Sequence, residues 1–331
     1  MTPFPAARAT GVGSLPGTDP LEAARLVLGE LPELPHLPEL PARGQHADLA
    51  GRGAALLAEL PVDLQPSGWR LVPRASRDGR RARDLLRRDL DALEEAADAT
   101  GAPPALKLQA TGPWTLSALL ELPRGERVLS DHGAVTDLAA SLAAGLAEHL
   151  ADVRRRFPAA PLVLQLDEPS LPAVLRAQVS NASGAGRLRA PDAARAAEVL
   201  RTVLSVADVG VVHCCAGGVP LPLLRRAGVH AVSLDASLLT SADDEAVGEA
   251  VESGTRLLLG LVPSTDGPLG AEKAVLAPLR QLWRRIGLDT DLLASAVTVT
   301  PSCGLAGATP AHARAALAAC ARAGARLDEL G

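Results

Sequence analysis

The sequence predicts a single-domain α/β protein, a (β/α)₈ TIM barrel over residues 1–331. Eight short β-rich runs alternate with long segments rich in alanine, leucine and arginine, an order typical of a parallel sheet with crossover helices. No low-complexity linker or internal repeat divides the chain, and barrels of this length fold as one unit. The predicted strands are Ala9–Gly13, Trp69–Pro73, Ala105–Ala110, Pro161–Leu166, Gly210–His213, His230–Leu234, Arg256–Val262 and Ala296–Thr300.

A doubly wound open sheet is the main alternative, and the glycines near the N-terminus argue against it. Gly11 and Gly13 end the first predicted strand, but Ser14-Leu15-Pro16 follows, where a dinucleotide-binding fold would open a helix with a third glycine. We therefore favour the barrel.

The segments between strands include two helices and two irregular stretches. Residues 78–100 interleave arginine with acidic residues, and residues 130–157 carry apolar residues at helical spacing, so both are predicted helices. Residues 31–44 contain four prolines, which exclude a helix interior, and we expect an extended loop across the surface. Residues 172–190 include the small, polar sequence 178–186, which predicts either a mobile lid over the barrel mouth or an ordinary surface loop.

Composition restricts the class of function. Hydrophobic residues make up 47% of the chain and charged residues 21%, the balance of a protein with a large buried core. A net charge of −5 argues against nucleic acid or an anionic membrane as partner. The sequence shows no signal peptide and no apolar run of the roughly 20 residues that a membrane span needs, so we expect a cytoplasmic protein. Four cysteines then favour metal binding or buried thiols over a disulfide framework.

The central candidate site follows the apolar run Val211-Val212. Successive side chains of a strand point to opposite faces, so His213 and Cys215 share a face and Cys214 points away. Two later strand ends offer further ligands, Asp235 and Cys303. Because the carboxyl ends of barrel strands meet at one mouth, these four side chains are expected to converge there. Histidine, thiolates and a carboxylate are ligands of zinc, so the sequence predicts a zinc site.

Plainer interpretations remain for the individual residues. A His-x-Cys pair is often a core histidine beside a buried thiol, and Cys320, in an alanine-rich helical stretch, is expected to be buried and inert. Asp167 and Glu168 are adjacent in sequence and cannot both face inwards. Asp167 is predicted either to accept hydrogen bonds from a substrate ammonium group or to cap the helix that begins near Pro169.

Taken in order, these residues resemble the cobalamin-independent methionine synthase family, specifically its catalytic C-terminal barrel. The resemblance covers nearly the whole chain, although each element is short. It rests on Gly11-Val12-Gly13-Ser14-Leu15-Pro16, Ala110-Thr111-Gly112-Pro113, Gln165-Leu166-Asp167-Glu168-Pro169, His213-Cys214-Cys215 and Cys303-Gly304-Leu305.

The resemblance implies a barrel of the methionine synthase and uroporphyrinogen decarboxylase-like type, with Zn²⁺ as cofactor. It implies a methyltransferase that activates a thiol, homocysteine above all, as a zinc thiolate and methylates it to methionine. The implied zinc ligands are His213, Cys215, Asp235 and Cys303, and the implied substrate contacts are Val12, Gly13, Ser14 and Asp167.

Several positions depart from the family pattern. Asp235 stands where the family has a glutamate, and residues 262–265 lack its proton-donating histidine. Its His-Gly-Glu element has no counterpart around residues 44–46, and the tryptophan that helps hold folate is absent near Leu119.

The methyl donor is expected to be methyltetrahydrofolate or methylcobalamin on a corrinoid protein. Lys107 and Lys273 are the only lysines available for a polyglutamate tail, and the second, N-terminal barrel of the folate enzymes lies outside these residues. We therefore expect faster transfer from the corrinoid. Alternatives are another zinc-dependent thiol alkyltransferase, a uroporphyrinogen decarboxylase-like enzyme, and a non-catalytic zinc-binding relative.

Overall fold

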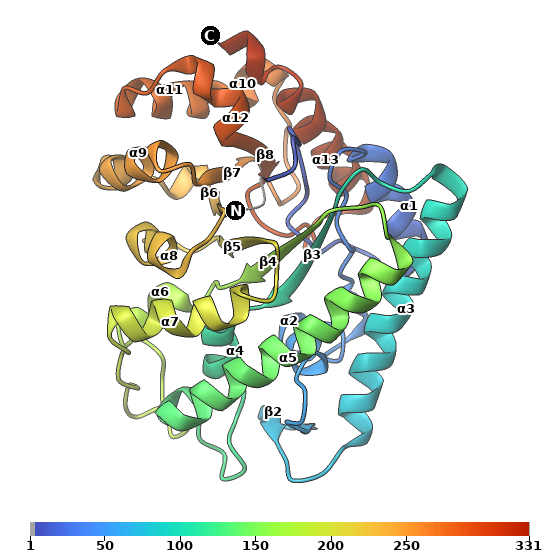
Figure 1. Cartoon of the computed structure of the whole chain (residues 1–331), viewed down its shortest axis with the longest axis vertical. Coiled ribbons are helices and arrows are strands. Elements are labelled where there is room, and N and C mark those ends of the chain that lie inside the picture. The colour runs from blue at the N-terminus through green and yellow to red at the C-terminus, as the bar shows by residue number, and fades with distance from the viewer. Residues whose placement is uncertain (1–3, 331) are drawn as a thin grey trace.

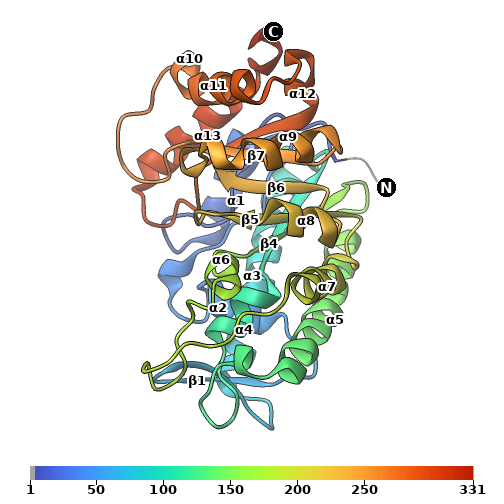
Figure 2. The ribbon, with the colours of Figure 1, turned by 90° about the vertical axis from the view of Figure 1, so that its left-hand side faces the viewer.

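The computed structural model describes residues 4–330 and contains a curled, six-stranded parallel sheet (Figures 1 and 2). Its strands neighbour one another in chain order, and every pair is parallel, which requires a crossover after each strand. The strands are β3 (Leu106–Thr111), β4 (Leu162–Asp167), β5 (Val209–Cys214), β6 (Ala231–Asp235), β7 (Arg256–Val262) and β8 (Val297–Pro301).

Helices cover the outer face of this sheet, and α5, α7, α8 and α9 pack in succession along it (Figure 1). The two longest, α3 and α5, match the predicted helices and begin at the N-caps Ser76 and Asp131. Across residues 4–330 no helix is long and apolar enough to cross a membrane. The helices are α1 (Pro20–Glu30), α2 (Leu49–Ala55), α3 (Arg77–Thr100), α4 (Pro113–Leu119), α5 (His132–Arg156), α6 (Leu171–Leu175), α7 (Ala193–Leu204), α8 (Leu221–Ala227), α9 (Asp244–Glu252), α10 (Glu272–Val275), α11 (Ala277–Ile286), α12 (Leu293–Ala296) and α13 (Pro310–Gly324).

Two extended segments lie along the edges of the sheet. The segment 8–15 pairs with β8, where Thr10 N donates to Val299 O at 3.1 Å, and the segment 35–39 pairs with β3, where Leu37 N donates to Lys107 O at 2.9 Å. The two segments also bond to each other, because Leu15 N donates to Glu39 O at 2.8 Å.

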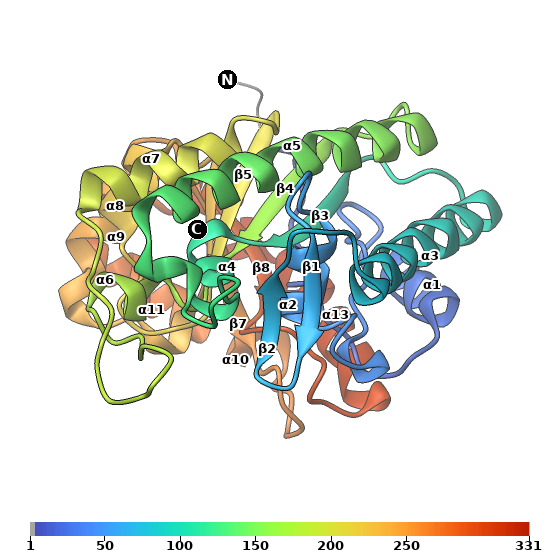
Figure 3. The ribbon, with the colours of Figure 1, turned by 90° about the horizontal axis from the view of Figure 1, so that it is seen from below.

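The structure corrects two predictions about this part of the chain. Trp69–Pro73 is not a strand of the main sheet, since β2 (Gly68–Leu71) forms an antiparallel hairpin with β1 (Val62–Gln65), apart from β3–β8 (Figure 3). Residues 31–44 do not cross the surface, since Leu34, Leu37 and Leu40 are fully buried. Prolines lack the N–H that a ladder needs, so this segment pairs through isolated bridges and shows no strand pattern in the sequence.

The concave side of the sheet encloses an apolar cluster of its own. Inward-facing residues of β4, β5, β6 and β7 meet there with the residues that immediately precede the two edge segments and β3, so the sheet curls around a filled interior. On β5 the buried residues Val209 and Val211 point into this cluster, so strand alternation points His213 inward above them, at the carboxyl end. The cluster comprises Ala7, Leu34, Ala105, Val163, Val209, Val211, Ala231 and Leu258.

Candidate metal centre

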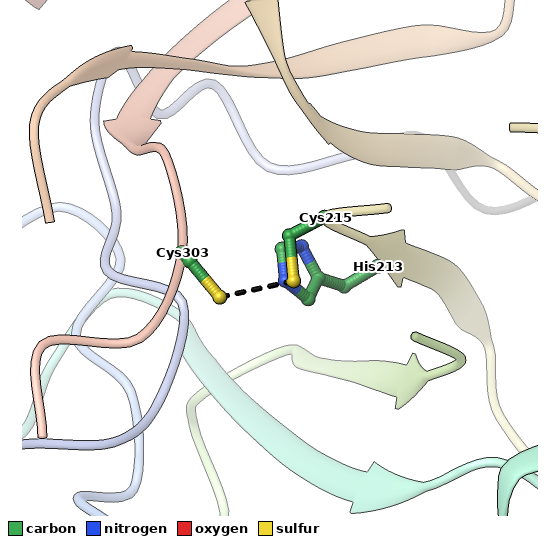
Figure 4. Close-up of side chains that lie close together, drawn as sticks. All are labelled: His213, Cys215 and Cys303. Atoms are coloured by element: carbon green, nitrogen blue, oxygen red, sulfur yellow. Dashed lines mark hydrogen bonds between the residues drawn. The ribbon is translucent and has the colours of Figure 1, made fainter. Parts of the chain in front are cut away.

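Three of the four predicted metal ligands meet at the carboxyl ends of the strands. Ligand atoms of His213, Cys215 and Cys303 all lie within 4.8 Å of one another (Figure 4). The thiol sulfurs of Cys215 and Cys303 are 3.0 Å apart. His213 is buried, and both cysteines are partly buried.

The curvature of the sheet makes this meeting possible. Cys215 follows β5 and Cys303 follows β8, and β6 and β7 lie between these two strands in the sheet. In a flat sheet, strands three positions apart would be about 14 Å from one another. Cys214 points away from the group, as strand alternation predicts, and is fully buried. Burial raises the pKa of its thiol to about 11.

His213 is oriented for a metal ion by a neighbour on β6. Its Nδ1 lies 2.9 Å from the hydroxyl of Ser233, which leaves Nε2 as the free ring nitrogen. Nε2 is buried and has no hydrogen-bond partner among residues 4–330. An orphaned buried nitrogen is costly unless it binds something, and Nε2 beside two thiols fits zinc in ligand type and number.

The two thiols differ in acidity because they share a hydrogen bond. The contact from Cys215 lowers the pKa of Cys303 to about 4, with His213 adding to the shift, and the same contact raises the pKa of Cys215. One thiol of the pair therefore ionises readily, which suits a site that binds a cation through sulfur.

Asp235, the fourth predicted ligand, is not brought into the group. Its Oδ1 accepts hydrogen bonds from the backbone N of Ser237 at 2.9 Å and from the hydroxyl of Ser237 at 2.7 Å. The carboxylate thus caps the short 3₁₀ helix η3 (Ala236–Leu238). The structure therefore brings together three side chains that could hold a metal, whereas the carboxylate of Asp235 is engaged as the cap of η3.

Asp167 and Glu168 point to opposite sides of β4, as predicted. Asp167 is buried, and its Oδ1 accepts a hydrogen bond from Nε2 of Gln165 at 2.7 Å. Burial raises the pKa of Asp167 to about 7, and the charge of His213 is the strongest effect that opposes this rise. Asp167 does not cap the following helix, since the N-cap of α6 is Ser170. Glu168 instead accepts the backbone N–H groups of Trp114 and Thr115 at the start of α4.

The predicted substrate strip Val12–Ser14 lies beside the metal ligands. A Cβ atom added at Gly304 would lie 2.0 Å from the hydroxyl oxygen of Ser14, so the residue after Cys303 must be glycine for the two segments to approach. Leu305 N also donates to Ser14 O at 2.8 Å. The structure therefore brings Ser14 next to Cys303, although they are far apart in sequence.

Sequence reasoning missed Glu39, a buried carboxylate on the segment 35–39. Its backbone bonds to Gly13 and Leu15, and its Oε1 lies 3.1 Å from Nε of Arg52. Its negative charge contributes to the raised pKa of Asp167. The available signal was a single acidic residue within the apolar, proline-rich run 34–40.

Comparison with solved structures finds proteins of similar fold. A B12-independent methionine synthase from Shewanella sp. W3-18-1, solved with selenomethionine, aligns over 98% of both chains with a TM-score of 0.61 and 13% identity. A methyltransferase from Methanosarcina mazei aligns over 97% of this chain and 94% of its own, with a TM-score of 0.50 and 17% identity. No curated protein matches the sequence significantly. The profile described as "Cobalamin-independent synthase, Catalytic domain" matches residues 7–326. The chain belongs to this family of cobalamin-independent synthase catalytic domains.

Proposed function

We propose that this protein is a zinc-dependent methyltransferase that transfers a methyl group to the sulfur of homocysteine and produces methionine. The observation that carries the proposal is the group His213, Cys215 and Cys303, in which Nε2 of His213 has no other partner. Family membership supports the same reaction class.

The three side chains hold the zinc, with Asp235 as an exchangeable fourth ligand. Bound zinc supplies a Lewis acid that favours ionisation of a substrate thiol at neutral pH. Ser233 fixes the orientation of the His213 ring. Ser237 hydrogen-bonds the carboxylate of Asp235, which can exchange this contact for the metal. A weak fourth ligand leaves room for the substrate, as in other catalytic zinc sites.

The amino-acid end of homocysteine lies against the strip Val12–Ser14, with its ammonium group toward Asp167 and Glu39. The negative charge of Glu39 acts on Asp167, and buried carboxylates favour a cation beside them. Their fixed positions orient the sulfur toward the methyl group and reduce the entropy cost of the transition state. In the transfer, the S–CH₃ bond forms as the donor's bond to the methyl carbon breaks, the donor keeps the electron pair, and the thiol proton leaves to solvent.

The curled sheet supports the proposal that the chain is a single domain built as an eight-membered barrel. In this proposal the segments 8–15 and 35–39 take the positions of the first two strands. They form backbone hydrogen bonds to β8, to β3 and to each other. We retain residues 172–190 as the proposed lid. This segment begins within α6, which follows β4, and Ser180 and Arg187 form an antiparallel bridge near its exposed tip.

The donor is either methyltetrahydrofolate or methylcobalamin carried by a corrinoid protein. We favour the corrinoid, because the chain's only two lysines are Lys107, fully buried in the barrel, and Lys273, so few lysines remain for a polyglutamate tail. Supplying each donor with homocysteine and zinc-loaded protein, and measuring methionine, separates the two. Turnover with the folate alone would reverse the preference and leave the acceptor unchanged.

The acceptor is tested directly at the metal. X-ray absorption of the zinc-loaded protein should show one additional sulfur neighbour at about 2.3 Å when homocysteine is added. Cysteamine and coenzyme M serve as controls for thiols without the amino-acid group. An unchanged sulfur count with homocysteine, together with an increase for a control thiol, would assign a different acceptor.

A further inference from the structure

Lys107 is a fully buried lysine on β3 that belongs to no metal group and points into the barrel. Its Nζ donates to the carbonyl oxygen of Val12 at 2.9 Å and to Oε1 of Gln165 at 2.8 Å. Burial lowers its pKa to about 7, and the negative charges of Asp167 and Glu39 oppose that shift. A buried ammonium is costly, so its retention in an otherwise apolar interior needs a reason.

The first consequence of Lys107 is the orientation of Gln165. An ammonium group can only donate, so the amide oxygen of Gln165 must face Lys107. Its NH₂ group is then directed at two acceptors, the carbonyl oxygen of Val12 at 2.9 Å and Oδ1 of Asp167 at 2.7 Å. Lys107 on one side and the two acceptors on the other therefore fix the same orientation of the amide, and Lys107 is the donor that satisfies its oxygen.

The second consequence is a fixed peptide at Val12. Its carbonyl oxygen lies near three donors, Nζ of Lys107, Nε2 of Gln165 and, at 3.2 Å, Nε2 of Gln109. The oxygen is thereby held toward the barrel axis, which sets the direction of the next residues of the strip, Gly13 and Ser14. The same lysine thus constrains both the carboxylate and the backbone strip at the amino-acid end of the site.

Residue size explains why this position holds a lysine in a chain of arginines. Of the 33 basic residues, only Lys107 and Lys273 are lysines. Lys107 pairs with Val163 in the sheet, at the level of the apolar cluster and four residue pairs before Asp167, and its Nζ reaches the side chain of Gln165. A compact ammonium can serve two acceptors from there, whereas the planar fork of an arginine needs more space.

We propose that Lys107 is a positioning residue for recognition of the amino group of the thiol substrate, acting through Gln165 on Asp167, while Gln109 and Gln165 also hold the carbonyl of Val12. This inference rests on the proposed function. Lys107 does not touch the substrate, since it is fully buried beneath these groups.

The test compares two thiols that differ only in the amino group, homocysteine and 4-mercaptobutyrate, by calorimetric titration of the zinc-loaded protein. In the variant Lys107→Met, the affinity for homocysteine should fall roughly 10- to 100-fold, the effect expected for losing hydrogen bonds to charged groups. The affinity for 4-mercaptobutyrate should change by less than about 3-fold, because its sulfur and carboxylate contacts remain. Zinc content should stay at one per chain.

Two comparisons separate positioning from general damage. Lys273→Met, at the other, exposed lysine, should leave both affinities unchanged. Asp167→Asn should cause the same selective loss, and adding Lys107→Met to it should weaken homocysteine little further, because both changes break one network. If Lys107→Met does not fold, Gln165→Leu tests the same link, with the same selective loss expected.

The outcomes are distinguishable. An equal loss for both thiols in Lys107→Met, or full additivity with Asp167→Asn, would assign Lys107 a purely structural role and overturn the inference. A wild-type protein that binds both thiols equally well would refute recognition of the amino group, and the inference with it. A wild-type protein that binds neither would refute the proposed function itself.

Discussion

Nδ1 of His213 and the hydroxyl of Ser233 lie 2.9 Å apart on neighbouring strands, and the two residues are direct partners in the pairing of β5 with β6. Both side chains are buried. The contact fixes which ring nitrogen of His213 is free for a metal and in which direction it points.

Replacing Ser233 by alanine should therefore weaken zinc binding about 10- to 100-fold without removing a ligand. Competition with a chromophoric chelator measures the affinity. Ser205→Ala, on the exposed end of α7, is the matched control and should bind zinc as the wild type does. Unchanged affinity in Ser233→Ala would mean that packing alone holds the imidazole.

The cysteine ligands should separate clearly by metal content. Cys215→Ser and Cys303→Ser should each lose stoichiometric zinc, because removing one thiolate leaves an incomplete site. Cys214→Ser should keep one zinc per chain, since Cys214 points away from the group. Elemental analysis of the purified variants is sufficient, and full zinc content in either of the first two would refute this ligand set.

Asp235 poses a sharper question, because its carboxylate caps η3 in the structure. If it is also an exchangeable ligand, Asp235→Ala should retain one zinc but bind it about ten times more weakly. Ser237→Ala removes the side-chain hydrogen bond to Asp235 and keeps the backbone one, so it should bind zinc at least as tightly as the wild type. Equal zinc affinity for Asp235→Ala and the wild type would leave Asp235 with its capping role alone.

A buried ion-pair network behind Glu39 should dominate local stability. Asp89 on α3 lies 2.7 Å from both Arg43 and Arg52, and Arg52 in turn reaches Glu39. Asp89→Asn leaves Arg43 without its carboxylate partner and Arg52 with Glu39 alone, and should lower the free energy of unfolding by about 3 kcal/mol. The control Asp84→Asn, in an exposed pair on the same helix, should change it by less than about 0.5 kcal/mol. Urea denaturation measures both, and equal effects would contradict the prediction.

Acid should destabilise the protein partly through His36. Burial, and then the charge of Lys107, hold its pKa well below the usual 6.5, so His36 stays neutral in the folded protein where the unfolded chain takes up a proton. Its contribution to stability is thus complete above pH 6.5 and is lost as the pH falls below it.

Between pH 7.5 and 5.5 this single residue should remove about 1 kcal/mol from the free energy of unfolding. Denaturation curves at both pH values, with zinc in excess, give the loss. His36→Gln should show a smaller loss by that amount, whereas His132→Gln, at an exposed residue, should lose as much as the wild type. Parallel losses in all three proteins would exclude His36 as the titrating group.

The sequence predicted correctly those features that depend on local geometry. Six of the eight predicted strands are strands of the parallel sheet, because a buried parallel strand is a continuous apolar run in any context. The sharing of one face by His213 and Cys215, and the opposite directions of Asp167 and Glu168, follow from the two-residue period of a strand.

Where the chain is irregular, sequence reasoning was wrong or silent. The segment Trp69–Pro73 is a short β-rich run like those of the sheet strands, so its sequence does not reveal that its partner is a hairpin strand. The proline-rich segment 31–44 has no strand pattern, yet it is buried against β3 and carries Glu39. The interaction of Asp235 with Ser237 is a local competition for a carboxylate, and spacing alone gives no indication of it.

What the sequence by itself determined is therefore the set of donor atoms and the faces of the strands that carry them, because both depend on residue type and a local period. Tertiary structure decided which donors meet. Cys215 and Cys303 come together only because the sheet curls, Ser14 approaches Cys303 only across Gly304, and Lys107 finds Val12 and Gln165 only in the closed interior. These contacts join residues far apart along the chain, and their distances are set by the packing of the whole fold rather than by any segment of it.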